Sequence, residues 1–125
     1  MNFVTLIISP YDTYHHKDFS SEEMLILGDF FTRDFACGYR EYQNWTFDDS
    51  QNASTSSNCT LLEKNEGLIV LSDLYSELKK PTQVRITRQN FVSLCNEWQE
   101  KVCNHRPKEV IIKHENDHFF IETKN

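Results

Sequence analysis

The sequence predicts an α+β domain in which one principal amphipathic helix packs on an antiparallel or mixed β-sheet. One segment near the C-terminus carries a full helical stripe of apolar residues. Several shorter runs are rich in β-branched and aromatic residues and are separated by turn residues, which is typical of strands. The length of 125 residues and the hydrophobic content of 38% fit a single domain, residues 1–125, with one core.

The first predicted element is a strand at residues 3–9, which is apolar and β-branched and ends before Pro10. A polar link that contains Tyr14, His15 and His16 follows. Adjacent histidines in a strand would point to opposite sides, so they form no metal site there. We therefore expect His15 and His16 in a surface loop.

Residues 20–31 allow two interpretations. Ser20 and Glu23 have the spacing of a capping box, which favours a short helix. The apolar run that follows is too short for its periodicity to decide, so a strand through residues 25–31 is the alternative.

Residues 35–47 alternate loosely between aromatic and polar side chains, which predicts an aromatic-rich strand with one face toward solvent. Residues 48–58 are rich in serine, threonine and asparagine. This composition predicts a mobile loop between antiparallel strands.

A β-hairpin is predicted next, with strands at residues 60–64 and 68–71. Asn65-Glu66-Gly67 between them is typical of a turn or a bulge. Lys79-Lys80-Pro81 is expected to end this block.

The clearest element is a helix capped by Thr87 that extends to about Cys103. Asn104 and Pro107 mark the sequence that stops it. Its apolar residues fall on one stripe and are expected to face the core: Phe91, Leu94, Cys95, Trp98 and Val102. A second hairpin, with strands at residues 109–113 and 118–123, completes the predicted fold.

His114, Glu115 and His118 form the pattern H-E-x-x-H, which is the signature of zinc proteases. That chemistry requires both histidines on one face of a helix, one turn apart, with the glutamate as general base. Here the motif lies between two β-prone runs, and Asn116-Asp117 is typical of a turn. We therefore expect a polar hairpin tip, and a metal-dependent hydrolase remains the alternative.

Other catalytic patterns are missing from the sequence. There are only three glycines, and they form neither a nucleophile elbow, a P-loop nor a dinucleotide fingerprint. The acidic pairs Glu22-Glu23 and Asp48-Asp49 are common as capping or solvent-facing groups. The sequence therefore predicts no catalytic residue, no metal ligand and no cofactor.

The cysteines are expected to be free thiols. Their spacing contains no C-x-x-C pair, and Cys95 and Cys103 are about 12 Å apart along the predicted helix, too far to bond. No signal-peptide core and no membrane-spanning stretch is visible. These features favour a cytoplasmic protein.

The net charge of −6 argues against nucleic acid or an anionic membrane as a direct partner. Nearly all of it comes from residues 18–49, which contain 8 acidic and 2 basic residues. Such an acidic window favours a basic partner and would speed its encounter. A solvated surface with no partner is the alternative.

The same window interleaves acidic and aromatic residues. Carboxylates pair with lysine or arginine on a partner, while tyrosine and tryptophan supply contact area at low entropic cost. In the alternative arrangement, the aromatic side chains face the core and the acidic ones face water. The predicted partner-binding residues are Asp29, Asp34, Tyr39, Glu41, Tyr42, Trp45, Asp48 and Asp49.

The last third of the chain resembles the immunity proteins of contact-dependent growth inhibition and related bacterial toxin systems. The resemblance lies in residues 84–91, in the helix with Trp98 and in the closing residues 107–112. It implies a non-enzymatic antidote, favoured as a monomer, that binds a cognate toxin domain and blocks its active site or substrate path. Such a toxin is often a basic nuclease. A small adaptor or regulatory domain is a further alternative.

Overall fold

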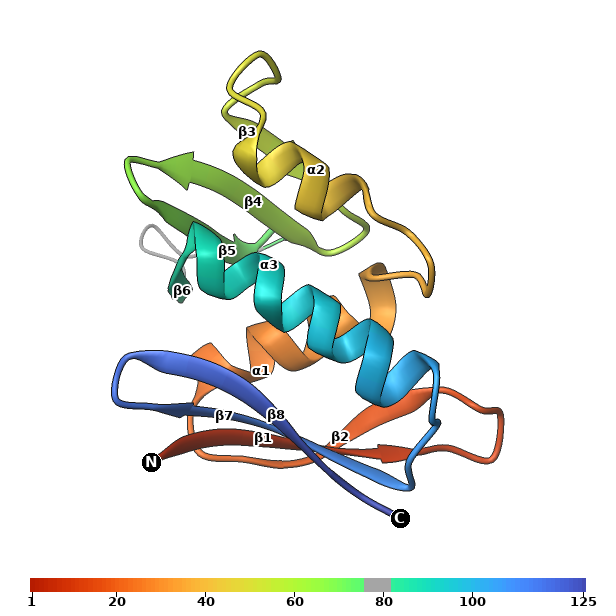
Figure 1. Ribbon diagram of the computed structural model, residues 1–125. Helices are drawn as coiled ribbons and strands as arrows, with labels where there is room; N and C mark the ends of the chain where they lie inside the picture. Colours follow the sequence, from red (N-terminus) through yellow and green to blue (C-terminus); the bar gives the residue numbers. More distant parts are fainter. Residues whose placement is uncertain (76–81) are drawn as a thin grey trace.

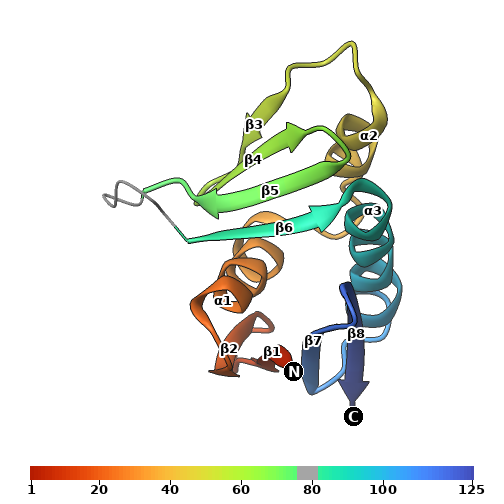
Figure 2. The same ribbon diagram turned by 90° about the vertical axis from the view of Figure 1, so that its left-hand side faces the viewer.

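In the computed structural model, which describes residues 1–75 and 82–125, the chain forms two antiparallel sheets with helices between them (Figure 1). The predicted α+β class is confirmed, but the strands divide between two four-stranded sheets rather than one. The helices α1 (Glu22–Asp29) and α3 (Arg88–Glu97) each contact strands of both sheets. They form the middle layer between the sheets (Figure 2).

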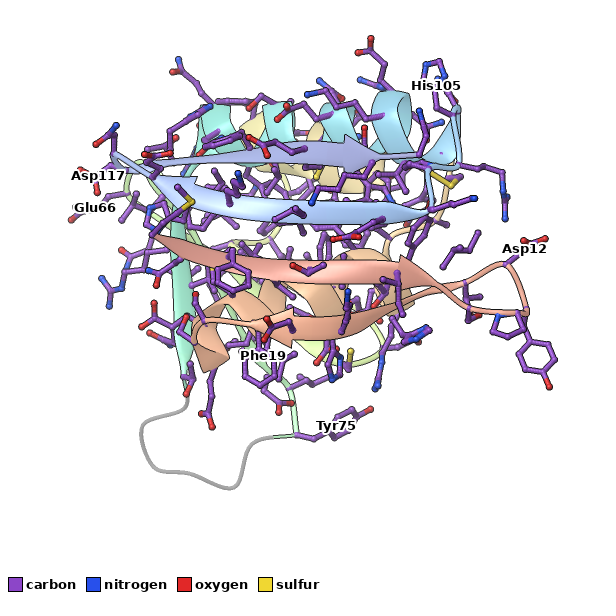
Figure 3. All side chains as sticks on the ribbon, turned by 90° about the horizontal axis from the view of Figure 1, so that it is seen from below. Asp12, Phe19, Glu66, Tyr75, His105 and Asp117 are labelled. Carbon is purple, nitrogen blue, oxygen red and sulfur yellow. A yellow bond between two sulfur atoms is a disulfide. The ribbon has the colours of Figure 1, made fainter. Side chains whose placement is uncertain are left out.

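The first sheet joins the two ends of the chain, because β1 near the N-terminus pairs with β7 near the C-terminus. Figure 3 views this sheet from outside and shows no helix over its outer face. Its order is β2 (Tyr14–Phe19), β1 (Asn2–Ile8), β7 (Glu109–Glu115) and β8 (His118–Lys124).

The second sheet is built from consecutive strands in the middle of the chain. Its order is β3 (Ser54–Ser56), β4 (Thr60–Asn65), β5 (Leu68–Asp73) and β6 (Gln83–Thr87). The predicted hairpin of β4 and β5 is confirmed, with Asn65 opposite Leu68 and a positive φ of 56° at Glu66. Lys79-Lys80-Pro81 lies outside the described residues.

The first predicted strand is confirmed as β1, but the expected polar loop after it is wrong. Residues 14–19 form the edge strand β2, in which His15 lies opposite Ile7 and His16 lies opposite Leu6. Most side chains of β2 are exposed, so the strand can consist largely of polar residues. Its composition therefore resembles that of a surface loop.

Residues 22–31 are helical, which decides between the two interpretations. The N-cap of α1 is Ser21 rather than Ser20, and its side chain accepts a hydrogen bond from the Met24 backbone N–H at 3.5 Å. Ser20 instead accepts one from the Phe3 N–H at 2.8 Å. A π-helical turn, η1 (Phe30–Asp34), continues α1.

The strand predicted for residues 35–47 is wrong, because this segment contains the helix α2 (Glu41–Phe47). Tyr42 and Trp45, one turn apart, turn toward the protein interior. The loosely spaced aromatic residues fit both a strand and a helix. The predicted loop at residues 48–58 is confirmed except for the edge strand β3, but it connects a helix to a strand rather than two antiparallel strands.

The predicted long helix is confirmed as α3 followed by a π-helical segment, η2 (Trp98–Cys103). Thr87 caps it by accepting from the Asn90 N–H at 3.1 Å. The whole predicted stripe is buried, and the Trp98 ring stacks on Phe31 with centroids 5.1 Å apart. The Asn90 side chain donates to the Phe119 carbonyl and accepts from the Phe119 N–H, both at 2.8 Å. This pair of bonds fastens α3 to β8.

The expectation of free thiols is wrong for Cys37 and Cys103, which form a disulfide across 66 residues of sequence. Cys59 and Cys95 are free, as predicted. Spacing along one helix does exclude a bond between Cys95 and Cys103. However, the partner of Cys103 comes from a loop before α2, and only the fold brings the two together.

Candidate functional site

The H-E-x-x-H motif forms the tip of the β7–β8 hairpin, as predicted. His114 lies opposite Phe119 and stacks on its ring at 3.9 Å, whereas Glu115 lies opposite His118. Successive residues of a strand point to opposite faces, so His114 and His118 lie on opposite faces of the sheet. They cannot bind one metal ion together in this arrangement.

Positive φ angles of 52° at Asn116 and 59° at Asp117 confirm the predicted turn. Among the residues that the structure describes, no group of three or more histidine, cysteine or acidic side chains is placed to hold a metal ion. In the same residues, no helix is both long and apolar enough to cross a membrane.

Two of the predicted partner-binding aromatics serve the core. Trp45 is only 4% exposed, its Nε1 donates to the Asn52 carbonyl at 2.8 Å, and the Lys64 ammonium lies 4.6 Å from its ring centre. Tyr42 is half-buried and meets the edge of Phe30 with centroids 5.1 Å apart. Trp45 was predicted to contact a partner, but it is buried. It faces inward from α2, and its hydrogen bond to Asn52 holds the loop that follows.

Hydrogen bonds of Asp34 link the end of η1 to the start of β4. Its Oδ2 accepts hydrogen bonds from the hydroxyls of Ser57 at 2.6 Å and Thr60 at 3.0 Å, and from the Cys59 thiol at 3.2 Å. Within the described part of the chain, its Oδ1 is buried without a partner. Burial and the neighbouring Asp34 carboxylate raise the pKa of the Cys59 thiol to about 11, so this thiol is a donor rather than a nucleophile.

Asp48 and Asp49 differ in their surroundings although they are adjacent. The Asp48 carboxylate accepts from the Ser50 hydroxyl at 2.5 Å and from Gln51 Nε2 at 3.0 Å. These hydrogen bonds lower the pKa of Asp48 to about 2. The Asp49 side chain is 82% exposed and pairs with Arg88 at 3.3 Å. Asp49 is therefore accessible to a partner although it is paired with Arg88, whereas Asp48 stabilises a turn.

Three of the predicted residues line one groove of about 400 Å³, which we call the tyrosine groove: Asp34, Tyr39 and Tyr42. Ser57 and Asn58 form part of the same lining. Tyr39 is 44% exposed and meets Tyr42 edge-on, with centroids 5.5 Å apart. The groove therefore offers an accessible tyrosine beside polar side chains.

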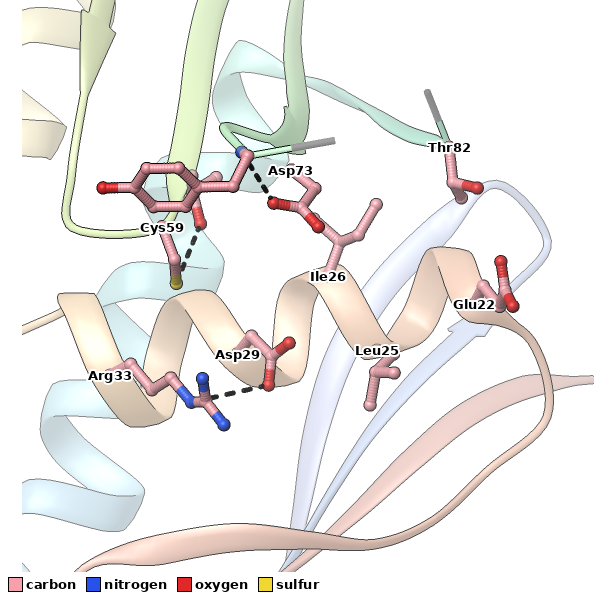
Figure 4. A pocket seen from close by; sticks show the side chains of 10 residues that line it. Glu22, Leu25, Ile26, Asp29, Arg33, Cys59, Asp73 and Thr82 are labelled. Carbon is pink, nitrogen blue, oxygen red and sulfur yellow. Dashed lines mark hydrogen bonds and ion pairs between the residues drawn. The ribbon is translucent and has the colours of Figure 1, made fainter. Parts of the chain in front are cut away.

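A larger cavity of about 450 Å³, which we call the α1 cavity, lies between α1 and the ends of β4, β5 and β6 (Figure 4). Cys59 and Thr60 line it, so residues 57–60 separate it from the tyrosine groove. Asp29 is the one predicted partner-binding residue in its lining. Burial raises the pKa of Asp29 above its ordinary value, although the nearby Arg33 and His16 act in the opposite direction.

The predicted set is therefore brought together only in part. Three of its members share the tyrosine groove: Asp34, Tyr39 and Tyr42. Asp29 lines the α1 cavity, on the other side of residues 57–60. The exposed Glu41 begins α2, and Asp49 lies on the loop that follows α2. Sequence reasoning missed Glu22, Arg33 and Asp73 of the α1 cavity. The spacing of Glu22, Asp29 and Arg33 by seven and four residues is a helical signal that would have grouped those three. Nothing in the sequence indicates Asp73.

Comparison with known proteins adds no relative: no protein-family model, no curated protein and no solved structure matches this chain.

Proposed function

We propose that this protein is a non-enzymatic immunity protein that binds and neutralises a cognate toxin domain, most simply a basic nuclease. The observation that supports this best is a surface with two hollows on either side of residues 57–60, each of which has at least one carboxylate in its lining. One hollow contains Asp29, and the other presents the exposed Tyr39. Carboxylates beside accessible aromatic side chains are suited to a cationic protein surface.

The net charge of −6 gives this surface a long-range role. Exposed carboxylates such as Glu41 and Asp49 attract a basic toxin before contact and orient it as it approaches. In the complex, these carboxylates occupy the positions that nucleic-acid phosphates take in the toxin's cleft. The antidote thus excludes the substrate without any chemistry of its own, and it needs neither a cofactor nor a metal.

The proposal places the protein in the cytoplasm, since a nuclease would meet nucleic acid there. It also takes the protein to act as a monomer. The disulfide of Cys37 and Cys103 bears on this point, because cytosolic thiols are usually kept reduced. Alkylation of free thiols at the moment of lysis, followed by mass analysis, measures which form exists in the cell. An oxidised pair in freshly lysed cells would contradict a cytoplasmic location.

The proposed function is tested by capture of the tagged chain from its native cells at low salt, with elution in steps of rising ionic strength. We expect a stoichiometric basic protein that is released as salt increases. That protein is then purified and assayed for nuclease activity with and without the antidote. A chain that elutes alone, or a partner whose activity the chain leaves unchanged, would refute the proposal.

The surface is tested by charge reversal with the double variant Glu41→Lys/Asp49→Lys. We expect slower association with the captured partner at low salt, by about tenfold, with little change in dissociation, because exposed rim charges act mainly on encounter. Glu100→Lys/Glu115→Lys, which reverses two exposed charges on other elements, is the matched control. Equal slowing by both pairs would show that only the net charge matters.

The alternative of a hydrolase that uses His114, Glu115 and His118 has no observation in its favour, because the two histidines lie on opposite faces of the sheet. An adaptor domain would use the same surface and differs only in what its partner does. The activity assay of the captured partner separates it from an antidote.

A further inference from the structure

The α1 cavity has two walls of different origin. One wall is a single face of α1 and η1, on which Glu22, Asp29 and Arg33 follow one another along the helix (Figure 4). The opposite wall comes from the strand ends and includes Asp73 and Tyr75. A volume of about 450 Å³ is in the range of sites that hold a small ligand or a large side chain.

The charges on the described lining of this cavity are unbalanced. The described lining carries the carboxylates of Glu22, Asp29 and Asp73 against the single guanidinium of Arg33. Asp73 acts on Asp29 as a like charge and opposes its ionisation. The described lining therefore presents excess negative charge around a half-buried carboxylate.

Among residues 1–75 and 82–125, the carboxylate of Asp29 has only two charged neighbours, and neither is close. Arg33 Nε lies 3.9 Å from it and His16 Nδ1 lies 4.0 Å from it, which is beyond hydrogen-bond distance in both cases. The Arg33 side chain is 66% exposed, so water screens much of its charge. In the described residues, no other donor reaches these oxygens. A carboxylate held this way gains most from a ligand that donates two hydrogen bonds and carries positive charge.

The remaining lining is suited to an alkyl chain that ends in a planar cation. Leu25 and Ile26 give α1 a half-buried aliphatic surface along the cavity. The Tyr75 ring is 72% exposed at the strand end and offers a face on which a guanidinium can stack. Arginine combines an aliphatic stem with a flat five-donor fork, whereas lysine ends in a point charge with no planar face.

We propose that the α1 cavity receives an arginine side chain from the protein partner. The guanidinium N–H groups of that arginine donate hydrogen bonds to the Asp29 carboxylate, and its aliphatic stem packs against Leu25 and Ile26. This inference rests on the proposed function, because it assigns the arginine to the toxin. It identifies the cavity as the place where a single partner residue would be anchored. Anchors of this kind, in a partly desolvated hollow, carry a large share of interface energy.

The test uses N-acetyl-arginine methylamide, an arginine without backbone charges, in a titration followed by ¹H–¹⁵N NMR. We expect saturable shifts in the backbone signals of α1, η1 and residues 73–75. N-acetyl-norleucine methylamide, which has an aliphatic stem but no cation, should leave these signals unchanged. N-acetyl-lysine methylamide should bind more weakly than the arginine probe. The absence of saturable shifts with the arginine probe, or equal binding of all three, would overturn the inference.

The matched variants are Asp29→Asn and Glu23→Gln, which each remove one negative charge from α1. Glu23 is exposed and does not line the cavity. We expect Asp29→Asn to weaken the probe about fivefold or more and Glu23→Gln to have little effect. Should Asp29→Asn fail to fold, Asp73→Asn replaces it, since Asp73 is exposed. Equal weakening by Glu23→Gln would show attraction to net charge alone and would overturn the inference.

The captured partner separates the two proposals. Undiminished partner binding by Asp29→Asn, with slower association of Glu41→Lys/Asp49→Lys, would refute the cavity inference and leave the proposed function intact. Reduced affinity of Asp29→Asn for the partner, with unchanged affinity of Glu23→Gln, would support both. Arginine-probe binding that depends on Asp29 while no partner is captured would overturn both the proposed function and the assignment of this arginine to a protein.

Discussion

Removal of the disulfide between Cys37 and Cys103 should lower the stability of the fold by about 4 kcal/mol. The bond links two residues that are 66 positions apart. In the chain-entropy treatment, a closed loop of that length restricts the unfolded ensemble by about this amount at 25 °C. The disulfide also holds the segment before α2 against η2, together with a hydrogen bond from the Gly38 N–H to Gln99 Oε1 at 2.5 Å.

The assay is urea unfolding of the oxidised protein and of the double variant Cys37→Ser/Cys103→Ser, followed by tryptophan fluorescence. A loss of about 4 kcal/mol corresponds to a fall in the midpoint of about 2 M, given the slopes usual for small domains. Cys59→Ser is the matched control, because Cys59 is free and serine keeps the donor to Asp34. Its midpoint should stay close to that of the oxidised protein.

Two results would refute this reasoning. One is a double variant that unfolds at the same urea concentration as the oxidised protein. The other is rapid alkylation of Cys37 and Cys103 in purified, folded protein that has been equilibrated with oxidised glutathione, which would show that the bond does not form. A midpoint that falls equally for Cys59→Ser would instead indicate a general effect of replacing cysteine.

Three further results follow from single side chains. Asn90→Ala should lower the free energy of unfolding by about 2–3 kcal/mol, because the buried backbone groups of Phe119 lose both partners. Asn44→Ala, at an exposed position of α2, should change the free energy of unfolding little, and urea unfolding measures both. Asp29→Asn should raise the unfolding midpoint at pH 7, because burial opposes the charged form, and this gain should disappear as the pH falls below the ordinary pKa of aspartate, where both side chains are neutral. The pKa of Asp48 in the folded protein is lowered to about 2, so its ionised form stabilises the fold. This stabilisation should be complete above the ordinary aspartate pKa and should disappear as the pH falls through about 2. A side-chain NMR titration that gives Asp48 an ordinary pKa would contradict this.

Elements with a strong local signal could be predicted from the sequence. The stripe from Phe91 to Val102 has helical spacing over three turns, and it is buried as predicted. The hairpin tip at Asn116-Asp117 was predicted because these residues accept positive φ angles. Both signals are local, since the residues that decide them are neighbours in the chain.

Two elements were predicted wrongly because their local signals were ambiguous. Tyr42 and Trp45 occur in an aromatic run whose spacing fits a strand as well as it fits α2. The polar strand β2 has the composition of a loop, and its pairing with β1 alone makes it a strand. In both cases, tertiary contacts overrode a weak local preference.

Only the residue types of the candidate site could be predicted from the sequence, and not their arrangement. The sequence placed acidic and aromatic residues in one window, but burial separates them into roles. Trp45 anchors a loop, Asp34 fastens β4, and Asp29 enters a cavity whose opposite wall contains Asp73. Which carboxylate keeps its hydration and which one loses it depends on neighbours that are distant in the sequence.

By itself, the sequence determined the α+β class, the core stripe of α3, the two hairpins and the acidic character of the surface, because periodicity, turn chemistry and charge are properties of neighbouring residues. Only the tertiary structure decided that the strands form two sheets, that Cys37 meets Cys103, and that Asp29 and Asp73 share a cavity. These features join segments that are distant along the chain, and their geometry arises only when the helices pack between the sheets.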